Sequence, residues 1–318
     1  MKFFFFFGAG FIGSHLTDRL LELGHEVTCY DNLSSSVEAN LNSARNYKNF
    51  SFIKGDTLNS EKLVGAMNGH EVVIHLSALE GSFLCQQNPS RCIQQNTIAS
   101  FNLLEAMKKN ETKSLFFLSS AQVYGKEGFL EDPVKENCFF PSQTSIYAAS
   151  KISTEAFMQA YSHSFDIQTC IFRTPTIIGE RYYRGLFFDI FKTLSKKPDH
   201  IKITSSTNKT CSFLHVSDLV QAILLCLDSN LSGFESYNIA LKEFLNFQDC
   251  IQLAIDELKL NPKIEFVLNP EEESIEMVSC ELLSVEKIEN IGWKAQVDLK
   301  TGIQRTMRYL NENKWLLE

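Results

Sequence analysis

Short apolar runs alternate with amphipathic segments along the first half of the chain. Each run is short, lacks charge and ends in small or polar residues, as is typical of parallel strands buried on both faces. The runs predict strands at residues 3–7, 27–30, 50–53, 72–76 and 115–118. Leu16, Leu20 and Leu23 recur at helical spacing after the first run, and Gly24 can end that helix. The alternation predicts an α/β fold with a Rossmann-like, doubly wound parallel sheet.

Two further helices are predicted in this half, at residues 92–109 and 145–163. The first is expected to carry its apolar side chains on or near one face, namely Ile93, Ile98, Phe101, Leu104 and Met107. After about residue 174 the alternation loosens, and helices are expected through Cys226, over 247–258 and from Leu299. We therefore expect a nucleotide-binding domain over 1–173 and a smaller substrate-binding part over 174–318, partly interleaved with the first.

A glycine-rich turn joins the first strand to the first helix. Gly8, Gly10 and Gly13 stand between them, and this context indicates a dinucleotide pyrophosphate held at a helix N-terminus. Asp31 ends the next strand, 18 residues after Gly13, where a carboxylate can bind the adenosine ribose. No arginine closely follows Asp31, so NAD is favoured over NADP. The alternative is that Asp31 only caps the turn before Asn32.

Polar residues recur where the other predicted strands end. Asp56, Ser77 and Ser120 occupy such positions, and the carboxyl ends of parallel strands form the ligand-binding edge of this fold. Asp56 is expected to face the adenine.

Tyr147 and Lys151 lie four residues apart on a predicted helix, and therefore on one face. A phenol titrates near pH 10, and a nearby ammonium favours the phenolate and lowers its pKa. A serine such as Ser120 could then hold the substrate hydroxyl whose proton the tyrosine takes. Taken alone, the pair could equally be a half-buried tyrosine and a solvated lysine.

Several motifs, in order along nearly the whole chain, resemble the extended short-chain dehydrogenase/reductases, in particular the nucleotide-sugar epimerases and dehydratases. They are GAGFIGSHL (8–16), YDNLSS (30–35), GD (55–56), VVIHLSA (72–78), Asn96 with NLLE (102–105), FLSSAQVYG (117–125), YAASK (147–151), FLHVSDL (213–219), YNIA (237–240) and IGW (291–293).

The resemblance implies NAD as cofactor and a nucleotide-diphosphate sugar as substrate. Tyr147 would take the proton of a sugar hydroxyl, Lys151 would hold the nicotinamide ribose, and Ser120 would bind the same hydroxyl. The cofactor contacts it implies are Gly8, Gly10, Phe11, Ile12, Gly13, Asp31, Asn32, Asp56, Thr57, Leu76, Ser77, Ala78, Asn96, Tyr147 and Lys151. It also suggests a homodimer built from the helices at 92–109 and 145–163.

The two residues after Ser120 discriminate between reactions. Dehydratases of the family carry an Asp-Glu pair there, because loss of water needs an acid and a base. This chain has Ala121 and Gln122, which favours a 4-epimerase acting through a transient 4-keto sugar. The alternatives are a C4 dehydrogenase or ketoreductase, a dehydratase, or a non-catalytic protein that senses a dinucleotide.

Three positions depart from the family pattern. Phe6 and Phe7 stand where a threonine and the first glycine are usual, so the turn is reshaped, NAD binding is weakened, or the other glycines tolerate the change. Cys211 replaces a diphosphate-binding arginine, and residues 271–273 are glutamates beyond Pro270. Candidate substrate contacts are therefore Gln122, Lys209, Arg181 and Arg184; the two arginines could equally form surface salt bridges.

Composition narrows the class of partner. The net charge is −8 without a basic block, which argues against nucleic acid as the main partner. The nine cysteines are scattered and form no metal-ligand spacing, so we expect no metal site and a reducing compartment. The apolar start is too short for a signal peptide, and no run approaches a membrane span. These features predict a cytoplasmic protein that does not bind membranes.

Overall fold

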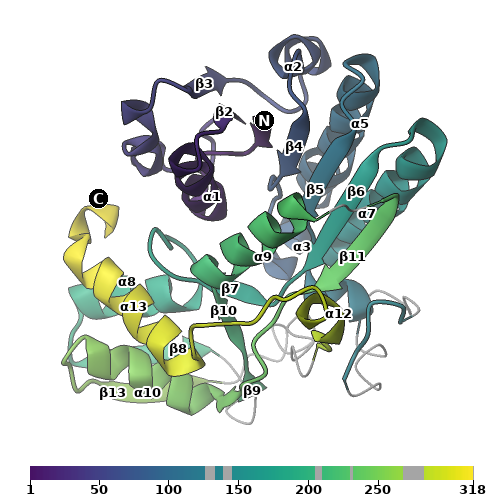
Figure 1. Ribbon diagram of the computed structural model, residues 1–318. Helices are drawn as coiled ribbons and strands as arrows, with labels where there is room; N and C mark the ends of the chain where they lie inside the picture. The colour runs from purple at the N-terminus through teal and green to yellow at the C-terminus, as the bar shows by residue number, and fades with distance from the viewer. Residues whose placement is uncertain (126–132, 139–144, 205–209, 230–231, 268–282, 318) are drawn as a thin grey trace.

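A seven-stranded, wholly parallel sheet forms the centre of the molecule. The computed structural model describes residues 1–125, 133–138, 145–204, 210–229, 232–267 and 283–317. The strand order is β11-β6-β5-β4-β1-β2-β3, with helices on both faces (Figure 1). The strands are β1 (Lys2–Phe6), β2 (Glu26–Asp31), β3 (Phe50–Lys54), β4 (Val72–His75), β5 (Ser114–Leu118), β6 (Gln168–Arg173) and β11 (Phe234–Asn238). The predicted Rossmann-like, doubly wound fold is confirmed.

The phenylalanines of β1 bury alternate side chains in two cores, one on each face of the sheet, and all four are fully buried. Phe3 and Phe5 pack with α1 (Phe11–Glu22) and α9 (Val216–Asp228), whereas Phe4 and Phe6 pack with α2 (Ser60–Met67), α5 (Ala99–Lys109) and α7 (Ile146–Phe165). Every residue from Phe3 to Phe6 must therefore be apolar, because a central strand has no side that faces solvent.

The helical segment before β5 differs from its prediction. It comprises α3 (Ser82–Gln87), α4 (Pro89–Cys92), a π-helical stretch (Ile93–Ile98) and α5. Leu104 and Met107 are fully buried, but Ile93, Ile98 and Phe101 are exposed, so the expectation of one shared apolar face is wrong. A π-helical stretch has more residues per turn than an α-helix, which shifts the face that later side chains present.

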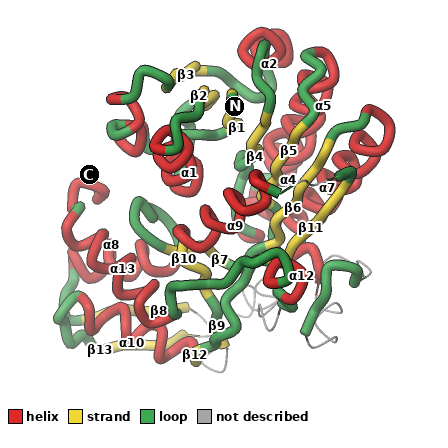
Figure 2. The backbone as a smooth tube through the Cα atoms, in the orientation of Figure 1, coloured by secondary structure: helices red, strands yellow, loops and turns green. Residues whose placement is uncertain are grey.

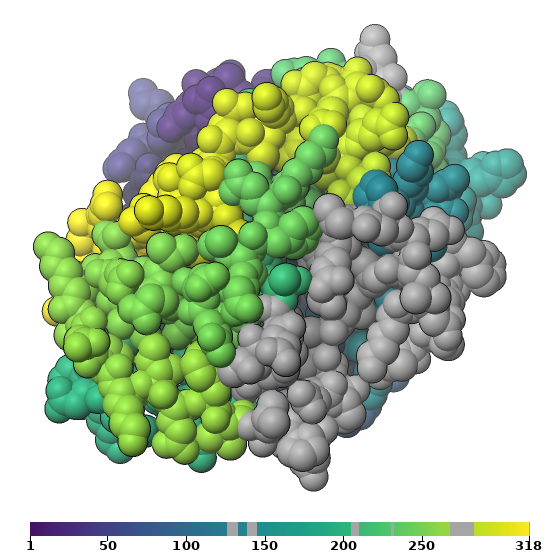
Figure 3. All heavy atoms as spheres, turned by 90° about the horizontal axis from the view of Figure 1, so that it is seen from below, coloured from purple at the N-terminus to yellow at the C-terminus, as the bar shows by residue number. Residues whose placement is uncertain are grey.

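Most elements after residue 175 pack around a separate core. They are β7 (Thr176–Ile178), α8 (Leu186–Lys196), β8 (His200–Thr204), β9 (Thr210–Cys211), β10 (Phe213–His215), β12 (Leu245–Asn246), α10 (Phe247–Glu257), β13 (Lys263–Val267) and α13 (Leu299–Glu312). Helix α12 (Glu286–Glu289) packs on the first core through Ile288. Helices α8, α10 and α13 share the separate core, and α13 lies beside α10 in the view from below (Figure 3). Strand β11 nevertheless pairs with β6 in the large sheet, and α9 packs on α1 (Figure 2).

A buried ion pair ties β6 to α7. Arg173 donates from Nη2 to Oε2 of Glu155 at 2.8 Å, and both side chains are at most 4% exposed. The Ser119 hydroxyl donates to the same carboxylate, and Nη1 of Arg173 donates to the Tyr124 phenol at 3.0 Å. The pair fixes the start of α7 relative to the end of β5, where the candidate site lies. No helix in the described ranges is long and apolar enough to cross a membrane.

Candidate active site

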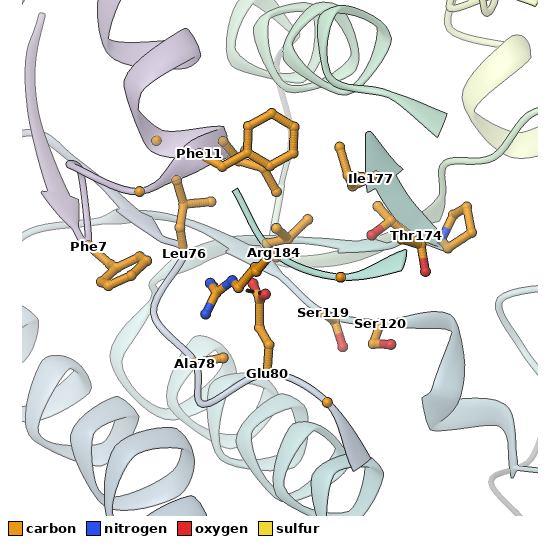
Figure 4. A pocket seen from close by; sticks show the side chains of 18 of the residues that line it. Phe7, Phe11, Leu76, Ala78, Glu80, Ser119, Ser120, Thr174, Ile177 and Arg184 are labelled. Carbon is orange, nitrogen blue, oxygen red and sulfur yellow. Dashed lines mark ion pairs between the residues drawn. The ribbon is translucent and has the colours of Figure 1, made fainter. Parts of the chain in front are cut away.

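A cavity of about 400 Å³ opens at the carboxyl edge of the sheet. One wall is the turn between β1 and α1, and the opposite wall comes from residues 174–177 and 182–185. The loop after β4, the end of β5 and the first turns of α7 complete it (Figure 4). The cavity therefore lies where open α/β sheets bind their ligands.

Ser120, Tyr147 and Lys151 meet in this cavity. Helix α7 begins at Ile146, with the Ser145 hydroxyl accepting from the Ala148 N–H at 3.4 Å, so Tyr147 and Lys151 lie in its first turns. Ser120 follows β5, and its hydroxyl accepts from the Gln122 N–H at 3.2 Å. Ser120 also lowers the pKa of the Tyr147 phenol. The Lys151 ammonium donates to the Leu118 carbonyl at 2.8 Å and lies 5.8 Å from the centre of the Tyr147 ring.

The pKa of Tyr147 is raised well above its usual value, so the expectation that Lys151 lowers it is wrong for this structure. Burial is the largest cause, and the negative charge of Glu80 adds to it, whereas Ser120 acts in the opposite direction. The Lys151 ammonium is directed at the Leu118 carbonyl rather than at the phenol. Burial also lowers the pKa of Lys151 to about 8.

Lys151 therefore lowers stability while it is charged. Its folded pKa lies below its unfolded pKa, so the unfolded chain binds more protons between these values and wild-type stability rises with pH. We expect Lys151→Met to raise the free energy of unfolding by about 3 kcal/mol near pH 7, and this gain to shrink by about 2 kcal/mol near pH 10. Urea unfolding of the NAD-free proteins measures both, and a gain independent of pH would contradict the assignment.

The turn after β1 fits a dinucleotide pyrophosphate. A Cβ on Gly8 would lie 2.3 Å from the Cys29 sulfur, and one on Gly13 would lie 2.8 Å from the Gly8 carbonyl, so only glycine fits at either position. Gly10 caps α1 without any side-chain bond, which leaves the first N–H groups of the helix available to an anion.

Asp31 ends β2 beside this turn, buried and not lining the cavity. Its carboxylate accepts from the Ala9 N–H, the Leu33 N–H and the Ser36 hydroxyl. Because a carboxylate offers about four acceptor positions, about one remains for a ribose hydroxyl. Asp31 can therefore both cap the turn and bind the adenosine ribose.

Phe7 is the residue that fits the dinucleotide least well. It takes the left-handed conformation itself, with φ of +78°, so the turn keeps a backbone that glycine adopts more easily. Its ring lines the cavity, and a Cβ on Gly10 would lie 2.6 Å from it. The ring thus covers the backbone that a pyrophosphate would approach (Figure 4).

Replacing Phe7 with glycine should therefore tighten NAD binding by about tenfold, equivalent to about 1.4 kcal/mol, because it removes the ring that covers the turn. The relieved backbone strain of about 1–3 kcal/mol should raise the free energy of unfolding instead. Titration calorimetry measures the change in NAD affinity. Phe7→Ala is the matched control for the ring alone, since it keeps the strained backbone. An unchanged or weaker affinity in Phe7→Gly would contradict this role.

The other sequence-predicted cofactor residues separate into two groups. The cavity lining includes Gly10, Phe11, Ile12, Gly13, Leu76, Ala78, Tyr147 and Lys151; it does not include Gly8, Asp31, Asn32, Asp56, Thr57, Ser77 or Asn96. A cofactor contact by Asn96 stays a prediction, and the structure gives the residue protein partners as well. Its amide is buried and bonds both backbone groups of Leu79 and the Ser150 hydroxyl, so it fastens the loop after β4 to α7.

Asp56 also has protein partners. It accepts from the Asn32 amide at 3.2 Å and from the Leu58 N–H at 2.8 Å, which closes the turn after β3.

Only some of the candidate substrate contacts line the cavity. Gln122 lines the cavity, and its amide oxygen accepts from the Ser82 hydroxyl at 2.8 Å. Arg184 lines the cavity and pairs with Glu80 at 3.1 Å (Figure 4). Arg181 does not line it, because its guanidinium pairs with Asp18 of α1 at 2.6 Å, which matches the salt-bridge alternative.

The remaining positions considered for binding the substrate diphosphate are Cys211, Lys209 and residues 271–273. Cys211 is buried against Cys250 and is not part of the cavity lining. Lys209 and the glutamates at 271–273 fall outside the described residues. Within the described ranges, no cluster of His, Cys, Asp or Glu could hold a metal ion.

Sequence reasoning missed Glu80 and the residues of the opposite wall. Glu80 is the one charged residue between β4 and α3, which was a usable signal. Residues 181–185 drew attention only for their two arginines, whereas Tyr182 and Tyr183 line the cavity as well. Nothing in the residues 174–177 indicated that they form part of the site.

Comparisons with known proteins agree with this geometry. The sequence model of the NAD dependent epimerase/dehydratase family matches residues 8–240. A putative UDP-glucose 4-epimerase of Methanocaldococcus jannaschii is 29% identical over 311 residues, which cover 96% of this chain and 97% of that protein. The dTDP-D-glucose 4,6-dehydratase of Homo sapiens is 28% identical over 323 residues, covering 96% and 89%. A crystal structure of UDP-galactose 4-epimerase matches with a TM-score of 0.87 at 26% identity, covering 99% and 100%.

Proposed function

Because the chain belongs to the NAD dependent epimerase/dehydratase family, we propose that it is a UDP-hexose 4-epimerase that works through a transient 4-keto sugar. The observation that carries this proposal is the meeting of Ser120, Tyr147 and Lys151 in one cavity, with Ala121 and Gln122 as the next residues. The choice of UDP as the nucleotide and of C4 as the reacting carbon follows two similar proteins, a putative UDP-glucose 4-epimerase and a UDP-galactose 4-epimerase.

Each residue of the trio has a distinct task in this proposal. The Tyr147 phenol exchanges the proton of the sugar hydroxyl, and Ser120 holds that hydroxyl while favouring the phenolate. Lys151 supplies positive charge beside the phenol and a donor for a ribose hydroxyl. NAD, when bound, accepts the hydride from the sugar and returns it. The turn from Gly8 to Gly13 and the start of α1 would hold its pyrophosphate, and Asp31 its adenosine ribose.

The residues after Ser120 favour epimerisation over loss of water. Ala121 has no acid–base group, and the carboxamide of Gln122 neither gives nor takes a proton as a carboxyl does. Among the described residues that line the cavity, Glu80 is the one carboxylate, and it is paired with Arg184. A dehydratase would lack its acid and base here.

Incubation with UDP-glucose tests the proposal. An epimerase forms UDP-galactose with no net change in reduced-nicotinamide absorbance. Stoichiometric reduced nicotinamide would identify a dehydrogenase, and a product lighter by one water a dehydratase. Binding of NAD without turnover of any UDP-hexose would favour the alternative of a non-catalytic protein that senses a dinucleotide.

We also propose that a second copy of the chain covers an apolar face formed by the π-helical stretch, α5 and α7. This face exposes Ile93, Ile98, Phe101, Phe157 and Phe165. The Phe101 ring lies 6.4 Å from the Phe157 ring and 6.5 Å from that of Tyr161, so the two helices form one surface. Apolar surface of this kind favours burial against a partner. Sedimentation of a monomer at micromolar concentration would contradict the homodimer.

A further inference from the structure

Residues 180–185, named here the strap, connect β7 to α8 along one side of the cavity. Tyr182, Tyr183, Arg184 and Gly185 line the cavity wall opposite Phe7 and residues 10–13. The strap therefore faces the turn at which a dinucleotide pyrophosphate would bind. Its contacts reach helix α1 and the loops after β2 and β4.

The first half of the strap is fastened to α1. Burial lowers the pKa of His15 to about 4, so its ring is neutral and donates to the Glu180 carbonyl at 2.7 Å. Arg181 pairs with Asp18 at 2.6 Å. The ring of Tyr182 packs edge-on against Phe11, the first residue of the helix, with 5.8 Å between ring centres.

The second half of the strap reaches across the carboxyl edge. The Tyr183 phenol donates to the Ser35 carbonyl at 2.7 Å, in the loop that follows β2 and Asp31. Burial raises the pKa of Tyr183 to about 12, so the phenol keeps its proton near neutral pH. Arg184 pairs with Glu80 at 3.1 Å, in the loop that follows β4 (Figure 4).

These contacts join the strap to α1 and to the loops after β2 and β4. A dinucleotide in this fold lies along the same elements, with its pyrophosphate at the N-terminus of α1 and its adenosine ribose at the end of β2. We propose that the strap closes over bound NAD, and that the Tyr183–Ser35 and Arg184–Glu80 contacts must break before the cofactor can leave. The two strap contacts would thereby compensate for the contact between backbone and pyrophosphate that the Phe7 ring obstructs.

The backbone of the strap suits this motion. Gly179 and Gly185 bracket it with φ of +145° and +91°, conformations open to glycine but to few other residues. Hinge residues of closing segments are often small. The contacts to α1 stay in place as an anchor, while residues 183 and 184 part from Ser35 and Glu80.

The rate of cofactor release tests the proposal without any sugar in the assay. Protein is loaded with NADH, mixed with excess NAD, and followed by nicotinamide fluorescence in a stopped-flow instrument. We expect Tyr183→Phe and Glu80→Gln each to speed release by about fivefold, and the double variant by about 25-fold, from one lost hydrogen bond and one lost ion pair. Arg184→Gln should match Glu80→Gln, and combining these two should add nothing, because they break one contact.

Matched controls lie away from the cavity. Tyr161→Phe removes a phenol that donates to Glu105, and Arg308→Gln removes an exposed arginine paired with Glu257; both should leave release unchanged. Melting temperatures verify that the variants fold. Release by the double variant within twofold of wild type would overturn the proposal, as would equal acceleration in the controls. Absence of NADH binding by the wild type would overturn it together with the cofactor assignment, whereas failure to interconvert UDP-hexoses would count only against the epimerase.

Discussion

Tyr147→Phe should lower kcat for UDP-hexose epimerisation by two to four orders of magnitude, the usual contribution of a positioned acid–base group. The phenol lines the same cavity as Ser120, and its residue is almost fully buried, so water cannot easily replace it. Phenylalanine keeps the ring and its packing but removes the hydroxyl. The loss should therefore fall on kcat rather than on KM or on NAD binding.

The matched control for this variant is Tyr161→Phe, on the same helix. Its phenol donates to Glu105 at 2.6 Å on the outer side of α7. Its kcat should stay within about twofold of wild type, since it lies outside the catalytic constellation. Turnover by Tyr147→Phe at the wild-type rate would refute the catalytic assignment, even if the protein proved to be an epimerase.

Arg173→Met should lower the free energy of unfolding by about 3–5 kcal/mol, the usual cost of removing one partner from a buried ion pair. The substitution leaves the Glu155 carboxylate buried with the Ser119 hydroxyl as a remaining donor and no opposing charge at hydrogen-bond distance. It also removes a donor to the Tyr124 phenol. Urea unfolding monitored by circular dichroism measures the change.

Removing Glu155, the other member of the ion pair, tests whether the buried charge causes this loss of stability. Arg173→Met combined with Glu155→Met should recover most of the loss, because it removes the uncompensated charge itself. Arg308→Met, at an exposed pair with Glu257, should cost under about 1 kcal/mol. A double variant no more stable than Arg173→Met would show that the cost arises from packing rather than from the buried charge.

The fold was largely predictable because each central strand contains a short run rich in apolar residues that ends at a recognisable turn. Strand β11 was the exception: its sequence, Phe-Glu-Ser-Tyr-Asn, mixes polar and apolar residues because it lies at the sheet edge. The face of α5 was misjudged because periodicity assumes a regular α-helix, whereas a π-helical stretch precedes it. Local pattern therefore identifies central strands well, and edges and helix irregularities poorly.

The site was predictable where chemistry follows from local spacing. Tyr147 and Lys151 lie one turn apart on any helix, and Ser120 ends an apolar strand. Glu80 and Arg184 were beyond reach as a pair, because 103 intervening residues separate them and only the tertiary fold brings them to 3.1 Å. The direction of the Tyr147 pKa was misjudged for a related reason. Desolvation depends on burial by distant segments, and sequence spacing does not measure it.

The five phenylalanines at the N-terminus also have a consequence for synthesis. Strand β1 needs β2 on one side and β4 on the other, so its second edge stays open until residues 72–75 have been made. At translation rates of about 5–20 residues per second, that wait is roughly 4 to 14 seconds. During it, the nascent chain presents an uncharged, strand-forming segment of the kind that aggregates. Production of this protein should therefore depend on chaperones that bind the emerging β1 segment, and should improve when the codons between β1 and β4 are translated fast.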